Sequence, residues 1–138
     1  MHNIIQSITD LKHSEYCTLA AIKYAAVKNN GSKVKVSELS DIMHVNSTAV
    51  SRTLRELEQK AFIERHTSEK DRRITYVNIT NDGKAALEKA EAQLTDFTSA
   101  VFERMGEDNL NRLTAYMNNL YDVMTEEIES RKKKGNDK

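Results

Sequence analysis

The chain has 138 residues and no proline, with 30% charged and 38% hydrophobic residues. This composition is typical of one helix-rich domain, or of one domain with a helical extension, and fits a soluble protein better than a fibrous or disordered chain. Lysine plus arginine and aspartate plus glutamate each number 21, so the formal net charge is 0. A general polyanion binder carries a basic excess, so contact with nucleic acid would require positive charge gathered on one face.

The sequence carries no export or membrane signal. No apolar run reaches the roughly 18 residues of a membrane-spanning helix, and MHNIIQSITDLKH lacks the basic and apolar regions of a secretory signal. We therefore expect a cytoplasmic protein. The single cysteine, Cys17, agrees with a reducing compartment.

Two helices are predicted before residue 31. The first is short and covers NIIQSITD, with its isoleucines on one side. The second follows Ser14 as N-cap and ends at the sequence NNG, residues 29–31. The predicted buried stripe of the second helix consists of Leu19, Ile22, Ala26 and Val27.

The next segment predicts a helix-turn-helix. A short extended piece at 33–36 precedes the helix ELSDIMHV, for which Ser37 is the expected cap. After a tight turn, Asn46 or Ser47 caps a further helix, which places Val50, Leu54, Leu57 and Ala61 on one face. Its outer face carries hydrogen-bond donors: Ser47, Thr48, Ser51, Arg52, Arg55 and Gln59.

A β-hairpin is predicted after the two helices. FIERHTS and RITYVNIT are β-rich and alternate in hydrophobicity around a charged tip formed by Glu69, Lys70, Asp71, Arg72 and Arg73. A helix-turn-helix followed by a hairpin is a winged helix, in which one helix enters the major groove of DNA and the hairpin tip lies over the backbone or minor groove.

Two long helices end the chain. Thr80 is the expected cap of the first, over 81–105, and the second starts at about Glu107. Their apolar stripes are too extensive for a monomer, so a second copy is expected to cover them. The last helix supplies the dimerisation candidates Leu110, Leu113, Met117, Leu120 and Met124.

These elements predict a mainly α fold with a small β-hairpin wing. The expected organisation is an N-terminal helix that contributes to dimerisation (1–13), a winged helix-turn-helix DNA-binding core (14–91), and C-terminal dimerisation helices with a basic tail (92–138).

Residues 36–87 resemble the DNA-binding core of the MarR family of bacterial transcription regulators. The marks are STAVSRTLRELE leading into FIER, then DRR before the second strand, then IT and DG at the start of the next helix. The resemblance implies that the N-terminal and the two C-terminal helices form a dimer interface. The first helix is shorter here than in the family pattern.

The resemblance implies a role for the charged tip. The family's pattern of Asp, any residue, Arg falls on Asp71, Arg72 and Arg73, so Arg73 is expected in the minor groove with Asp71 orienting it. Lys70 adds a further positive charge. The alternative is a solvated turn whose ion pairs contribute about 0–1 kcal/mol.

Arg52 and Arg55 are candidates for guanine or phosphate contacts, and Ser47, Thr48 and Ser51 for contacts near the helix start. The alternative is a solvated face on which the two arginines pair with nearby glutamates. A second group, which either contacts the DNA backbone or only adds solubility, is Lys28, Lys33 and Lys35.

His13 and Cys17 lie four residues apart, hence on one helix face, which suggests either a redox sensor or a small buried thiol. Two ligands do not make a metal site, so no metal and no cofactor is expected. A small aromatic effector is a candidate partner, because tyrosines and methionines at helical spacing form either a pocket or plain core. The tyrosines are Tyr16, Tyr24, Tyr116 and Tyr121.

The sequence therefore predicts a homodimeric, sequence-specific, DNA-binding transcription regulator, an effector-responsive repressor that binds a pseudo-palindromic operator. The alternatives are a winged-helix protein-interaction module and a Cys17-based redox sensor. An enzyme is not expected, because no Gly-rich phosphate loop, no nucleophile with its base and no paired carboxylates occur.

Overall fold

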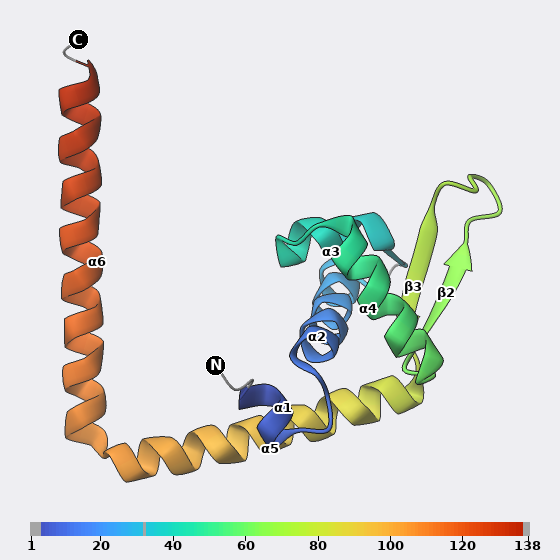
Figure 1. Cartoon of the computed structure of the whole chain (residues 1–138), viewed down its shortest axis with the longest axis horizontal. Coiled ribbons are helices and arrows are strands. Elements are labelled where there is room, and N and C mark those ends of the chain that lie inside the picture. Colours follow the sequence, from blue (N-terminus) through green and yellow to red (C-terminus); the bar gives the residue numbers. More distant parts are fainter. Residues whose placement is uncertain (1–3, 32, 137–138) are drawn as a thin grey trace. The chain divides into compact units, whose positions relative to one another are not determined.

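The computed structural model describes residues 4–31 and 33–136, with side chains described to residue 133. It contains two compact units, Met1–Asp96 and Phe97–Lys138. The elements along the chain (Figure 1) are α1 (Ile4–Ile8), α2 (His13–Lys28), β1 (Val34–Lys35), α3 (Val36–Met43), α4 (Ser47–Gln59), β2 (Ile63–Thr67), β3 (Thr75–Ile79), α5 (Asn81–Met105) and α6 (Glu107–Asn136).

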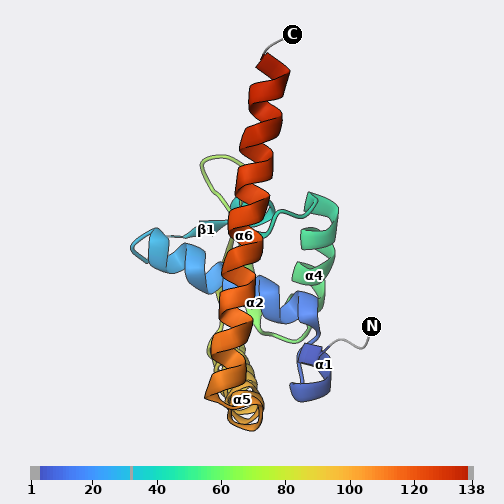
Figure 2. The same ribbon diagram turned by 90° about the vertical axis from the view of Figure 1, so that its left-hand side faces the viewer.

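The predicted winged helix is present in the first unit. Strands β2 and β3 form the expected antiparallel hairpin, and β1 adds a third strand on the other side of β3, which pairs Val34 with Val77. Helix α2 packs against α3, α4 and the sheet, and Figure 2 shows α2 beside α4. The chain is thus mainly α with a small β wing, as the sequence predicts.

Helices α2 to α5 and the sheet share one hydrophobic core. Leu19 of α2, Leu39 of α3, Leu54 of α4, Val77 of β3 and Leu87 of α5 are almost completely buried. Each such side chain contributes about 1.5–3 kcal/mol to folding through removal from water. This core holds α4 rigidly and leaves its opposite face in solvent.

Local capping explains where α4 and α5 begin. Asn46 accepts a hydrogen bond of 2.8 Å from the backbone N–H of Ala49, and Thr80 accepts one of 3.0 Å from that of Gly83. Thr80 was the predicted cap of α5, and Asn46 was one of the two candidates, with Ser47, for α4. The predicted caps Ser14 and Ser37 are wrong, because α2 and α3 begin earlier, after Lys12 and Lys35.

The start of α2 depends on a buried carboxylate. Glu15, with a fully buried side chain, accepts a 3.0 Å hydrogen bond from the backbone N–H of Lys12, which satisfies a donor that the helix leaves unpaired. The Nζ atom of Lys60 lies 2.7 Å from the same carboxylate. Lys60 is 45 residues from Glu15 in the sequence. The start of α2 therefore depends on a tertiary contact that the local sequence does not contain.

Two other predictions of burial are wrong. Val27, in the last turn of α2, is 74% exposed. Ala61 is exposed in the turn after α4, where its φ of +58° takes it off the helix.

In the second unit, α6 is a single helix with an exposed apolar face. Leu113, Met117, Leu120 and Met124 are all about half-exposed along it, and Leu110 is partly buried. Within the described part of the chain, none of the helices has both the length and the apolar character that crossing a membrane requires.

Candidate DNA-binding surface

The outer face of α4 presents polar donors to solvent. Val50, Leu54 and Leu57 anchor the helix in the core, so its period of 3.6 residues turns the opposite side outward. The outward side chains are exposed except Ser51, which is half-buried: Ser47, Thr48, Ser51, Arg52, Arg55 and Gln59. All the residues expected from the sequence on this face lie on it.

The wing tip has a defined turn. The carboxylate of Asp71 accepts a 2.9 Å hydrogen bond from the backbone N–H of Arg73, and the Asp71 carbonyl accepts one of 2.9 Å from the N–H of Ile74. The Arg73 side chain is 95% exposed, and its Nε atom lies 3.9 Å from the Asp71 carboxylate. Lys70 and Arg72 are also exposed, so the tip offers three cations to a partner.

An ion pair joins α4 to the wing. The Nε atom of Arg65, in β2, donates a 3.0 Å hydrogen bond to Glu58 of α4, and this bond lowers the pKa of the Glu58 carboxyl. The Glu58 carboxylate is therefore already paired with Arg65 of the wing strand β2. The pair helps to hold the wing strand in a fixed orientation to α4.

The solvated-face alternative pairs Arg52 and Arg55 with Glu56, Glu58 or Glu38, and in the structure Arg52 lies near Glu56. Its Nε atom lies 3.5 Å from Glu56, which also receives a 2.9 Å hydrogen bond from Lys12 of the α2 start. Glu58 pairs with Arg65, and Glu38 accepts a hydrogen bond from Asn29.

The three further lysines lie at the end of α2 and on or beside β1. Lys28, Lys33 and Lys35 are exposed, and the Lys33 ammonium lies 5.6 Å from the centre of the Tyr76 ring. This cation–π contact gives Lys33 a structural partner.

Cys17 and His13 meet as the helical spacing predicts. The Cys17 Sγ and His13 Nε2 atoms are 3.5 Å apart, and burial raises the pKa of the thiol. Cys17 is half-buried, and a raised pKa keeps its sulfur protonated, which argues against a reactive thiolate. Among residues 4–31 and 33–136, no three His, Cys, Asp or Glu side chains are grouped to hold a metal ion.

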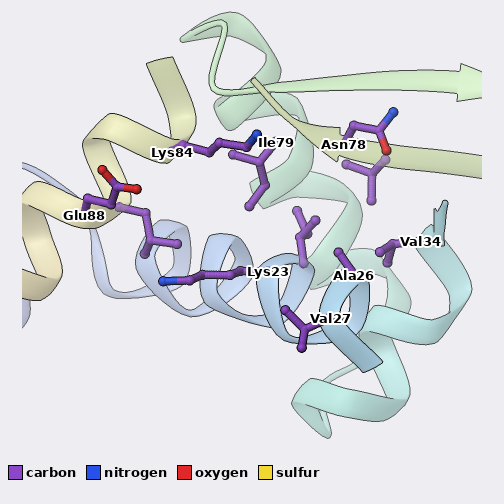
Figure 3. Close-up of a pocket in the computed structure, with 11 residues that line it drawn as sticks. Lys23, Ala26, Val27, Val34, Asn78, Ile79, Lys84 and Glu88 are labelled. Atoms are coloured by element: carbon purple, nitrogen blue, oxygen red, sulfur yellow. The ribbon is translucent and has the colours of Figure 1, made fainter. Parts of the chain in front are cut away.

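The first unit also contains a pocket of about 450 Å³ that the sequence did not reveal. It lies between α2, β1, β3 and the start of α5, where Ile22, Val34 and Val77 contribute apolar walls. Figure 3 shows Lys23, Lys84 and Glu88 toward one end and aliphatic side chains toward the other. The lining consists of aliphatic side chains, the charged Lys23, Lys84 and Glu88, and the amide of Asn78, so the tyrosine pattern gave no signal for it.

Comparison with known proteins agrees with this geometry. A sequence model of the MarR family matches residues 26–75. The chain is 30% identical over 95 residues to the uncharacterized HTH-type transcriptional regulator YdgJ of Bacillus subtilis, and the match spans 64% of this chain and 58% of YdgJ. It is 27% identical over 119 residues to the HTH-type transcriptional regulator SarZ of Staphylococcus aureus, across 82% of this chain and 74% of SarZ.

The fold is also that of a solved structure with DNA. A mutant of MarR from Escherichia coli, complexed with operator DNA, superposes with a TM-score of 0.63 at 23% identity, over 86% of this chain and 81% of the other. Residues 26–75 thus match the MarR family of transcription regulators, and the two relatives are HTH-type transcriptional regulators. The chain as a whole is similar to these proteins and shares the winged helix-turn-helix fold of Escherichia coli MarR.

Proposed function

We propose that the protein is a homodimeric, sequence-specific DNA-binding regulator, an effector-responsive repressor of a pseudo-palindromic operator. The observation that carries this proposal is the concentration of donors and cations on α4 and the wing in a chain of zero net charge. A polar face held rigidly by a core on its other side suits recognition of base edges. The fold is shared with a mutant of Escherichia coli MarR that was solved with operator DNA, which also supports DNA binding by this chain.

In this proposal α4 enters the major groove. Arg52 and Arg55 then contact base edges or phosphates, while Ser47, Thr48 and Ser51 use the positive end of the helix dipole near the backbone. At the wing tip, Arg73 enters the minor groove, and Asp71 restricts the conformations of the turn that carries it. Lys70 and Arg72 add contacts to the backbone.

A second copy of the chain is the proposed partner of α6. The apolar side chains recur at steps of three and four residues, which is the spacing of a helix-packing seam, and most of them are exposed in the single chain. The five seam residues are Leu110, Leu113, Met117, Leu120 and Met124. Two-fold symmetry would present two α4 helices to major grooves roughly 34 Å apart.

The proposed effector is a small molecule with an apolar, aromatic body and an anionic group. The pocket between α2, β1, β3 and α5 is large enough for such a molecule at about 450 Å³. Lys23 and Lys84 lie toward one end of the pocket (Figure 3), where they would bind the effector's anionic group, Lys23 in exchange for its two 2.9 Å hydrogen bonds to the Glu91 carboxylate. A ligand that binds one dimer geometry more tightly would shift the population away from the DNA-competent spacing.

The experiment that tests DNA binding is selection from a random pool of duplex DNA at near-physiological salt, with Arg73→Ala beside the unmodified protein. The expected result is an enriched inverted repeat whose enrichment falls in the variant. If neither protein enriches any sequence with or without candidate effectors, the regulator proposal fails. A winged-helix module that binds other proteins would then be the alternative to test.

A further inference from the structure

A second concavity, with charged and hydroxyl side chains in its wall, lies where the first turn of α2 meets the outer side of α4. Its volume is about 700 Å³, and Lys12, Ser14, Thr48, Arg52 and Glu56 contribute to its wall. Lys12, Ser14 and Glu56 belong neither to the wing nor to the donor face that the sequence predicts. All five side chains lie within the first compact unit.

One carboxylate organises the two cations of this concavity. Glu56 Oε2 accepts a 2.9 Å hydrogen bond from the Lys12 ammonium, while Glu56 Oε1 lies 3.5 Å from the Nε atom of Arg52. The hydrogen bond from Lys12 lowers the pKa of Glu56, and the same bond raises the pKa of Lys12. All three groups are therefore charged at neutral pH, and together they carry one positive charge.

The backbone beneath Lys12 is fixed from inside the protein. Its N–H donates 3.0 Å to the buried Glu15 carboxylate, which Lys60 reaches from the end of α4. Lys12 is thus tied to α4 through its main chain by way of Glu15 and Lys60, and through its side chain by Glu56. A lysine held in this way loses less side-chain entropy on binding than one on an unrestrained surface.

The groups that remain available have the chemistry of a phosphate site. An ammonium has three donors, of which Glu56 takes one, so two can point to an anion. Arg52 faces Glu56 with Nε, which leaves its terminal Nη groups for a partner. The exposed hydroxyls of Ser14 and Thr48 add two neutral donors. An oxyanion with a single negative charge matches this set.

We propose that this concavity binds a backbone phosphate of duplex DNA, with Lys12 as the anchoring cation and Glu56 as the residue that positions both Lys12 and Arg52. The inference rests on the proposed DNA-binding function and extends it from α4 and the wing to the start of α2. Glu56 also has a guard role, by which we mean that its negative charge reduces the attraction of Lys12 and Arg52 for any anion. A poorly placed phosphate therefore gains little electrostatic energy, whereas a phosphate that reaches the free donors of both cations is favoured.

The first test compares Lys12→Ala with Lys89→Ala on a random-sequence duplex and on the selected operator. Lys89 is a matched control, because it is an exposed lysine that donates 2.6 Å to Asp10 and lies on α5 rather than α4. Lys12→Ala should weaken binding to both duplexes several-fold and lower the salt slope by about one, as loss of one phosphate contact does. Lys12→Arg should restore the slope. Equal slopes for Lys12→Ala and Lys89→Ala would overturn the proposal.

The second test uses Glu56→Gln, with Glu91→Gln as control, because each glutamate pairs with a lysine at 2.9 Å and Glu91 lies on α5 rather than α4. Freeing Lys12 and Arg52 should tighten binding to the random duplex by about threefold to tenfold and steepen the salt slope. Discrimination between operator and random duplex should fall. A Glu56→Gln protein that folds normally by thermal unfolding but binds random DNA no tighter would overturn the guard role.

Inorganic phosphate separates a DNA site from a site for a free anion. In this test, the melting temperatures of the unmodified protein and of Lys12→Ala are measured with millimolar phosphate. The DNA assignment would be overturned if phosphate stabilised only the unmodified protein while Lys12→Ala still bound DNA normally. Failure of the unmodified protein to bind any duplex is a different result, since it defeats the proposed function itself. A loss of binding in Lys12→Ala, beside normal binding by Lys89→Ala, supports the phosphate site.

Discussion

Asp71 holds Arg73 through the main chain more closely than through the guanidinium. Its carboxylate accepts a 2.9 Å hydrogen bond from the Arg73 backbone N–H, whereas the Arg73 Nε atom is 3.9 Å away. The aspartate therefore shapes the turn first and leaves the arginine side chain extended into solvent. This arrangement suits a side chain that must reach a partner from a loop of defined geometry.

The wing prediction follows from this geometry. Arg73→Ala should weaken binding to many duplex sequences and lower the salt slope by about one, because one phosphate or minor-groove cation is lost. Asp71→Asn should retain most of the affinity, since an amide oxygen can accept the same backbone hydrogen bond, and Asp71→Ala should not. Fluorescence anisotropy over a salt series measures all three. Unchanged affinity and slope in Arg73→Ala would remove the wing from the mechanism.

Base recognition by α4 can be assigned residue by residue. Arg52→Ala or Arg55→Ala should relax the preference at particular base pairs by about 1–3 kcal/mol, which is the discrimination of a bidentate contact to guanine. Repeating the duplex selection with each variant measures the change at every position. A uniform loss over all sequences would instead identify that arginine as a backbone contact.

The dimer seam is tested by charge. Leu113 and Leu120 are each about half-exposed on α6, and lysine at both positions would place charges inside an apolar interface. The double variant should sediment as a monomer and lose most operator affinity, while its helical circular dichroism stays largely intact. The exposed α6 residue Asn118, replaced by Lys, controls for added charge. A double variant that still sediments as a dimer would refute this interface.

Replacement of Gly83 by a residue with a Cβ atom should create a packing defect at the start of α5. A Cβ atom at this position would overlap the Phe62 carbonyl oxygen and lie 2.8 Å from Ile79 Cγ2. That carbonyl accepts a hydrogen bond from the backbone N–H of Thr80, so it cannot move freely. Gly83→Ala should lower the free energy of unfolding by about 2–3 kcal/mol, as overpacking does.

Gly31→Ala is the comparison for Gly83→Ala. Nothing lies within 4 Å of a Cβ at Gly31, and only its φ of +78° opposes the substitution. A loss of about 1 kcal/mol is expected there. Urea unfolding measures both variants, and an equal or smaller loss in Gly83→Ala would contradict the packing argument.

The effector pocket is tested with a plain aromatic acid. Naphthoate should raise the melting temperature of the unmodified protein and weaken its operator binding, because the acid stabilises one dimer geometry. Lys23→Ala combined with Lys84→Ala should abolish the thermal shift, whereas Lys89→Ala should keep it. An identical shift in the double variant would place the acid elsewhere on the protein.

Local chemistry explains most of what the sequence predicts correctly. Side-chain periods of 3.6 and 2 mark the helices and the hairpin, and the Asn46 and Thr80 caps act within three residues of themselves. The exposed face of α4 follows from the same periodicity, because buried leucines at fixed spacing leave only one side for the polar residues. These features depend on neighbours in the chain, so an amino-acid sequence contains them directly.

The tertiary structure decided the features that depend on distant partners. Lys12 and Glu56 are 44 residues apart, and Glu15 and Lys60 are 45 apart, so no local pattern links them. The N-cap of α2 was mispredicted for this reason, since the stability of its first turn comes from a buried carboxylate held by a residue at the end of α4. Likewise, the pocket between α2, the sheet and α5 exists only because packing leaves space between elements that the sequence separates. The sequence by itself determined the winged-helix pattern and its polar face; packing alone decided which charges meet and where a cavity remains, because both depend on three-dimensional proximity.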